Sequence, residues 1–132
     1  ASDVYKRQLY VQLLLAKIIL SKTPPNEFEI KNLISVLEKT TPNTSDDEYS
    51  INQALIGCYT ITKNEQMRLF YIAKNLYLET CEEEFLRGNS IAKNNNIAKI
   101  KSILKEALKK SNSNPNIKNK INSFLKYISS IN

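Results

Sequence analysis

Apolar side chains recur along much of this chain with the period of an α-helix, and this pattern limits what the chain can fold into. It is clearest from Ile97 to Lys110, where lysines occupy one face. The opposite face carries the apolar residues Ile97, Ile100, Ile103, Leu104, Ala107 and Leu108. Only two glycines and four prolines interrupt the 132 residues, which disfavours the frequent turns of a β-sandwich. The sequence therefore predicts an all-α fold of about seven short helices packed as antiparallel pairs.

The first eight residues, Ala1 to Gln8, match the translation of a transposase mosaic-end sequencing adapter at every position. We expect them to be an artefact of sequencing mixed or environmental DNA, and we exclude them from the prediction of the fold. On this interpretation the natural protein continues upstream of Leu9. With 42% hydrophobic and 24% charged residues, the whole sequence has the composition of a folded protein. We expect residues 9–132 to form a single helical domain, truncated at its N-terminus.

Capping patterns divide the chain into its expected helices. Leu9 to Ser21 is apolar on nearly every side, which predicts a helix covered by protein all round, with part of this cover supplied by a segment upstream of Leu9. The next helices are expected to begin at Asn26, Ser45 and Thr62, because each of these residues has an acidic residue three positions later. Thr80 and Glu83 repeat this spacing, so a further break is expected near Thr80. A final helix is expected from Ile117 to Ile128.

The two cysteines, Cys58 and Cys81, have no metal-site spacing and are too few to cross-link a secreted scaffold. A reducing cytoplasm is the expected location. The longest apolar stretch is shorter than the roughly 20 residues needed to span a bilayer, so no membrane partner is expected.

Residues 85–114 resemble a tetratricopeptide repeat, a helix-turn-helix unit of helical-repeat proteins. The matching positions are Gly88, Ile91, Ile97, Leu104, Ala107 and Leu108. Arg87, Ile100 and Asn112 depart from the residue types usual in that family. The resemblance implies a short right-handed α-solenoid of stacked antiparallel hairpins. In this register Ile97 opens the second helix of the repeat, and residues 117–128 would form the terminal capping helix.

The same resemblance implies a protein- or peptide-binding role. The family's groove is lined by exposed positions of the first helices, which fall here on Glu82, Asn89 and Lys93. A weaker similarity links the chain to the C-terminal peptide-sensing domains of Rgg-type transcriptional regulators, which carry a helix-turn-helix domain upstream.

Charge is distributed unevenly along the chain. Residues 1–86 contain 9 basic and 12 acidic side chains, whereas residues 87–132 contain 10 basic and 1 acidic. Lys101, Lys105 and Lys109 recur every four residues and form a basic stripe that could attract phosphate backbones or acidic proteins. The stripe contains neither arginine nor aromatic residues, so nucleic-acid binding is the alternative and protein binding the preferred prediction.

No group of residues suggests catalysis. The chain has no histidine, and its two glycines are isolated rather than clustered in a phosphate-binding loop. Glu82, Glu83 and Glu84 are adjacent, so on a helix their side chains diverge and are expected to be solvated. We therefore expect no enzyme activity, no metal and no cofactor. The sequence leaves the oligomeric state and the identity of the partner open.

Overall fold

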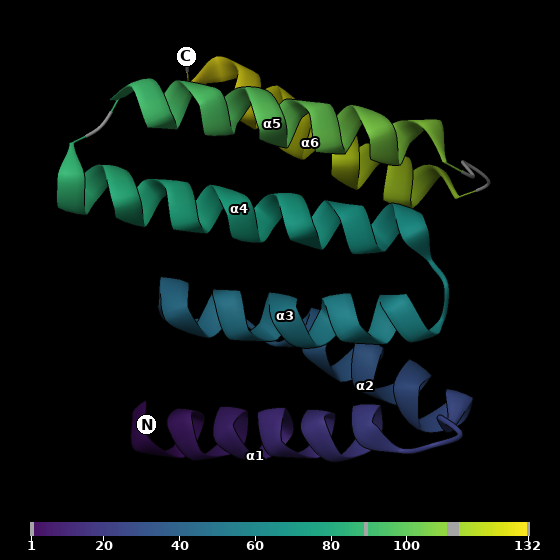
Figure 1. Ribbon diagram of the computed structural model, residues 1–132. Coiled ribbons are helices and arrows are strands. Elements are labelled where there is room, and N and C mark those ends of the chain that lie inside the picture. The colour runs from purple at the N-terminus through teal and green to yellow at the C-terminus, as the bar shows by residue number, and fades with distance from the viewer. Residues whose placement is uncertain (1, 89, 111–113, 132) are drawn as a thin grey trace. The chain divides into compact units, whose positions relative to one another are not determined.

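The structure is a computed structural model that describes residues 2–88, 90–110 and 114–131. In these residues the chain forms six α-helices and no strand, which confirms the all-α class but gives six helices where about seven were expected (Figure 1). The helices are α1 (Ser2–Ser21), α2 (Glu27–Lys39), α3 (Ser45–Ile61), α4 (Glu65–Arg87), α5 (Ser90–Lys109) and α6 (Pro115–Ser130). None of the helices in the described part is both long and apolar enough to cross a membrane.

The break expected near Thr80 is wrong, because α4 continues through that residue to Arg87. Thr80 is buried, and its hydroxyl donates to the carbonyl of Leu76 at 2.6 Å instead of capping a new helix. The helix ends at Gly88, whose φ of 62° lies in the left-handed region that glycine adopts without strain. The backbone N–H of Gly88 closes the last turn by donating to Glu84 at 2.8 Å.

The turn between α4 and α5 lies earlier in the chain than the tetratricopeptide resemblance requires. The match places Gly88 inside a first helix and starts a second at Ile97, but Gly88 lies between α4 and α5. From Ser90 to Lys109 the chain is one uninterrupted helix, so the expected helix start at Ile97 is wrong.

Short polar side chains cap the starts of α2, α3, α4 and α6. The Asn26 carboxamide accepts a hydrogen bond from the N–H of Glu29 at 3.1 Å, which confirms the predicted start of α2. At α3 the cap is Thr44 rather than Ser45, and at α4 it is Asn64 rather than Thr62. Asn114 caps α6 and is followed by Pro115, whose fixed φ suits the first turn of a helix.

The chain divides into two compact units, residues 1–63 and 64–132. In the first unit α1, α2 and α3 pack against one another around side chains with at most 2% of their surface exposed. These are Ala16, Ile30, Leu37, Leu55 and Cys58. Helix α1 also includes residues of the stretch that matches the adapter: the Tyr5 hydroxyl donates to the carbonyl of Thr41 and accepts from the N–H of Asn43.

In the second unit α5 packs against both α4 and α6. Its predicted apolar face supplies four fully buried residues, Ile97, Ile100, Leu104 and Ala107. Removing one such leucine side chain from water stabilises a fold by about 2 kcal/mol, so this face contributes strongly to the stability of the unit. The buried Gln66 side chain donates to the carbonyl of Ala107 at 3.1 Å and thereby ties α4 to α5.

Candidate interaction site

The positions implied by the tetratricopeptide resemblance lie around the end of α4 and the start of α5. Glu82 is exposed on α4. The Lys93 ammonium lies 3.0 Å from the carboxylate of Glu84 and so bridges the two helices. Asn89 lies outside the described residues. Lys93 therefore forms its ion pair with Glu84 inside the hairpin of α4 and α5.

The basic stripe lies along one flank of α5. Lys101 is half-buried, whereas Lys105 and Lys109 are exposed. Glu106, on the same helix, lies 4.0 Å from the ammonium of Lys109 and 3.6 Å from that of Lys110. This carboxylate offsets part of the positive charge at the C-terminal end of the stripe, since ion pairs on an exposed helix face are weak but reduce the local potential.

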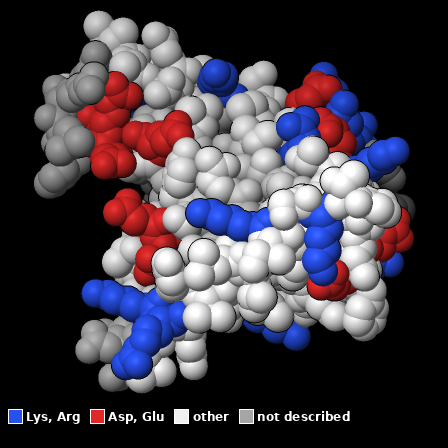
Figure 2. Space-filling view, turned by 60° about the horizontal axis from the view of Figure 1, so that its bottom comes forward, with Lys and Arg blue, Asp and Glu red and all other residues white. Residues whose placement is uncertain are grey.

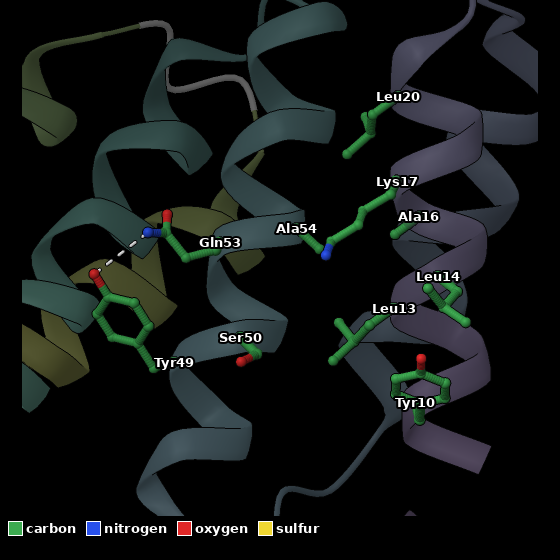
Figure 3. A pocket seen from close by; sticks show the side chains of 10 residues that line it. All are labelled: Tyr10, Leu13, Leu14, Ala16, Lys17, Leu20, Tyr49, Ser50, Gln53 and Ala54. Carbon is green, nitrogen blue, oxygen red and sulfur yellow. Dashed lines mark hydrogen bonds between the residues drawn. The ribbon is translucent and has the colours of Figure 1, made fainter. Parts of the chain in front are cut away.

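A pocket of about 450 Å³, which the sequence did not predict, lies between α1 and α3 (Figure 3). From α1 it is lined by Tyr10, Leu13, Leu14, Ala16, Lys17 and Leu20. From α3 it is lined by Tyr49, Ser50, Gln53 and Ala54. Leu13, Lys17 and Leu20 extend from α1 toward α3 (Figure 3). We call this pocket the α1/α3 groove.

The groove exists because two parallel helices meet through side chains of unequal size. Near the start of both helices the Tyr5 hydroxyl bonds to Thr41 and Asn43, immediately before α3. Near their ends Leu20 lies against Gly57, so closely that a Cβ atom at Gly57 would come within 3.0 Å of the leucine. Between these contacts α3 presents the small residues Ser50 and Ala54, which do not fill the space opposite the leucines of α1.

The outer side of α1 is also apolar and uncovered by the described residues. Tyr10 is 64% exposed and Ile18 57%, and Val11, Leu14 and Leu15 are exposed as well. Figure 2 turns α1 toward the viewer, and uncharged side chains, drawn white, make up most of the surface seen there. The described residues therefore cover this helix on one side and leave its outer side exposed. Contiguous exposed apolar surface of this kind is typical of binding surfaces.

Polar groups occupy the rim of the groove. Gln53 donates to the Tyr49 hydroxyl at 3.3 Å (Figure 3), and Lys17 is the one charged residue that lines the pocket. Asp46 precedes Ser50 by four residues and Gln53 by seven, so it lies on the same face of α3, one turn beyond the pocket. Lys17 and Asp46 form no ion pair with any described residue.

A second cluster, of aromatic side chains, joins α4 to α6. The Tyr77 and Tyr127 hydroxyls lie 3.0 Å apart, and Phe124 packs edge-on against Phe70 and Tyr77. The Lys74 ammonium lies 5.6 Å from the centroids of both phenylalanine rings. Burial, together with hydrogen bonds to Tyr127 and Cys81, raises the pKa of Tyr77. The rings already contact one another and the lysine, so this cluster serves packing.

Comparison of the chain with models of protein families, with curated proteins and with solved structures finds no match. Among the described residues no three His, Cys, Asp or Glu side chains are placed so that they could hold a metal ion. Two sequence signals could have indicated the groove. One is the apolar character of α1 on all sides, and the other is the spacing of the small residues Ser50, Ala54 and Gly57 along one face of α3.

Proposed function

We propose that this chain is a protein-interaction module that holds apolar side chains of a partner in the α1/α3 groove. The observation that carries the proposal is the combination of an apolar-walled pocket with an adjoining exposed face of α1. Pockets with apolar walls and a few polar groups at the rim are the usual seats of bound ligands and peptide side chains. Tyr10 suits such a role, because tyrosine contributes a large contact area at low entropic cost.

The proposal can be tested by filling the groove with a larger side chain and measuring peptide binding. A phage-displayed library of randomised helical peptides is panned on the full chain, and enriched peptides are measured by fluorescence anisotropy. Ala54→Leu places a bulky side chain in the pocket and should weaken binding by about tenfold or more, which corresponds to the loss of one good apolar contact. Ala98→Leu, at an exposed position of α5, is the matched control and should bind like the wild type.

Circular dichroism and thermal unfolding confirm that both variants are folded. Equal binding to the wild type and to Ala54→Leu would refute the groove as the binding site, as would a failure of the library to yield any binder.

We propose nucleic-acid binding through the basic stripe as a second candidate function. It is supported by the exposure of Lys105 and Lys109 in one row on α5. Electrophoretic mobility shifts at low and moderate salt test it, because contacts with phosphates lose affinity steeply as salt rises. Replacing Lys101, Lys105 and Lys109 by glutamine should abolish a low-salt complex. Absence of any shift at low salt would remove this candidate.

The relation to tetratricopeptide-like solenoids remains a prediction for the second unit. The successive pairs α4 with α5 and α5 with α6 support it, since helical-repeat proteins stack consecutive helices in this way. The position of the turn at Gly88 departs from the repeat. A relation to the peptide-sensing domains of Rgg-type regulators is supported only by the α1/α3 groove, which could accept a peptide.

A further inference from the structure

We infer that the segment bound in the α1/α3 groove is an amphipathic helix of a partner protein, with an acidic and a basic side chain about two turns apart on either side of its apolar anchors. This inference rests on the proposed function. It adds the secondary structure of the partner segment and the order of its charges.

The geometry of the groove favours a helix over an extended peptide. One row of residues on α1 lines the groove at intervals of three or four positions, and it consists of Tyr10, Leu13, Lys17 and Leu20. On α3 two rows line it at intervals of four positions, Tyr49 with Gln53 and Ser50 with Ala54. Rows with this spacing form ridges, and the side chains of a third helix can pack into the grooves between such ridges. A helix seated there would also cover Leu14 and Tyr10, which are exposed.

The charges at the two ends of the groove are opposite. Lys17 lies on α1, and its side chain reaches toward Ala54 of α3 (Figure 3). Asp46 lies at the other end, in a first turn that also contains Asp47 and Glu48. Eight residues separate Asp46 from Ala54, which is about 12 Å along a helix axis.

A partner helix that matches both ends needs side chains of opposite charge at the same separation. It would place an acidic side chain beside Lys17 and a basic side chain, seven or eight residues away, beside Asp46. Its apolar side chains, three or four residues from each charge, would enter the pocket between Leu13 and Ala54. Charge matching of this kind selects the register and direction of a bound helix more than it raises affinity.

The peptide library tests this inference directly. Peptides enriched on the wild type should carry an acidic and a basic residue seven or eight positions apart, with apolar residues between them. The double variant Lys17→Glu with Asp46→Lys should bind peptides with exchanged charges better, by about tenfold relative to the original order. A variant with Lys6 and Arg7 replaced by serine should keep the wild-type preference, because neither of these charged residues lines the groove.

The results separate the inference from the proposed function. If Ala54→Leu abolishes binding but the charge-exchanged variant keeps the original preference, the inference is wrong and the groove is still the binding site. Enriched peptides without helical spacing of their apolar residues would also overturn it. If sedimentation shows that the chain dimerises and that Ala54→Leu makes it monomeric, the groove is occupied by a second copy, and the inference of a separate partner fails.

Discussion

Cys58 and Cys81 are chemically identical side chains in opposite surroundings. Cys58 has no exposed surface and lies in the core of the first unit, whereas Cys81 is exposed on α4. Burial raises the pKa of Cys58 to about 11, because a thiolate in apolar surroundings loses its hydration. The sequence could count these cysteines but could not rank their reactivity, which depends on burial.

This difference predicts selective thiol labelling. With a chromogenic disulfide reagent at neutral pH, one thiol per chain should react rapidly and the second only after the chain is unfolded with denaturant. Cys81→Ser should remove the rapid phase, while Cys58→Ser should leave it intact. Two rapid equivalents in the folded wild type would contradict the placement of Cys58.

The raised pKa of Cys58 also predicts a loss of stability at alkaline pH. The folded chain holds this proton more tightly than the unfolded chain, so the contribution is complete below pH 9 and declines as the pH rises toward 11. The expected loss is roughly 2 kcal/mol, measured as the free energy of unfolding in urea. Burial, with Glu38 nearby, raises the pKa of Tyr59 too, and this adds to the loss in the same direction once the pH exceeds the ordinary tyrosine value of 10.0.

Cys58→Ala isolates the contribution of the thiol, because it removes the titrating group and keeps Tyr59. Its stability should fall less between pH 9 and 11 than that of the wild type, whereas Cys81→Ala should follow the wild type. Parallel curves for Cys58→Ala and the wild type would rule out Cys58 as the source.

At the scale of the helix, the capping residues show what a sequence pattern can and cannot decide. Thr44 with Asp47 and Ser45 with Glu48 have the same spacing, and the predicted helix start rests on the second pair. In the structure the Thr44 hydroxyl accepts from the N–H of Asp47 at 3.0 Å. The two starts differ by one residue, and which one is used depends on how the apolar face of α3 meets its neighbours.

The helix caps provide a matched pair of substitutions. Thr44→Ala should lower the free energy of unfolding by about 1 kcal/mol, since it leaves the N–H of Asp47 without its partner. Ser45→Ala lies one position inside the helix and should change it by only a few tenths of a kcal/mol. Urea titrations followed by circular dichroism measure both. A larger effect at Ser45 than at Thr44 would show that the predicted start was correct.

The continuity of α4 illustrates the second limit of sequence patterns. Thr80 and Glu83 have the spacing of a capping box, yet Thr80 points into the unit and bonds to the preceding turn. A hydroxyl that bonds back to the residue four positions earlier is compatible with the interior of a helix. Only the packing of α4 distinguishes this arrangement from a cap, and that packing involves residues distant in sequence.

At the scale of the whole chain, the core was more predictable than the groove. The apolar faces of α2, α5 and α6 follow from periodicity alone, and Ile30, Leu104 and Ile121 are buried as that periodicity requires. The groove depends on what lies opposite Ser50 and Ala54, which periodicity does not specify. The partner-binding role was predicted for Glu82, Asn89 and Lys93 from the tetratricopeptide resemblance alone. The sequence contains no information about which surface of the folded chain is exposed and apolar.

The core of the second unit gives a prediction at this scale. Leu104→Ala should destabilise residues 64–132 by about 2–5 kcal/mol, since it removes a fully buried side chain and leaves a cavity. Hydrogen exchange of α4, α5 and α6 should accelerate accordingly. Lys105→Ala, at the next and exposed position, is the control and should leave exchange nearly unchanged.

The order in which the helices pack has a consequence for the rate at which the chain folds. Within each unit, helices that contact one another are neighbours along the chain or are separated by a single helix. Few long loops have to close before these contacts form, so the barrier should be low and each unit should acquire its structure within microseconds to milliseconds. Temperature-jump or stopped-flow refolding would reveal this as a fast phase.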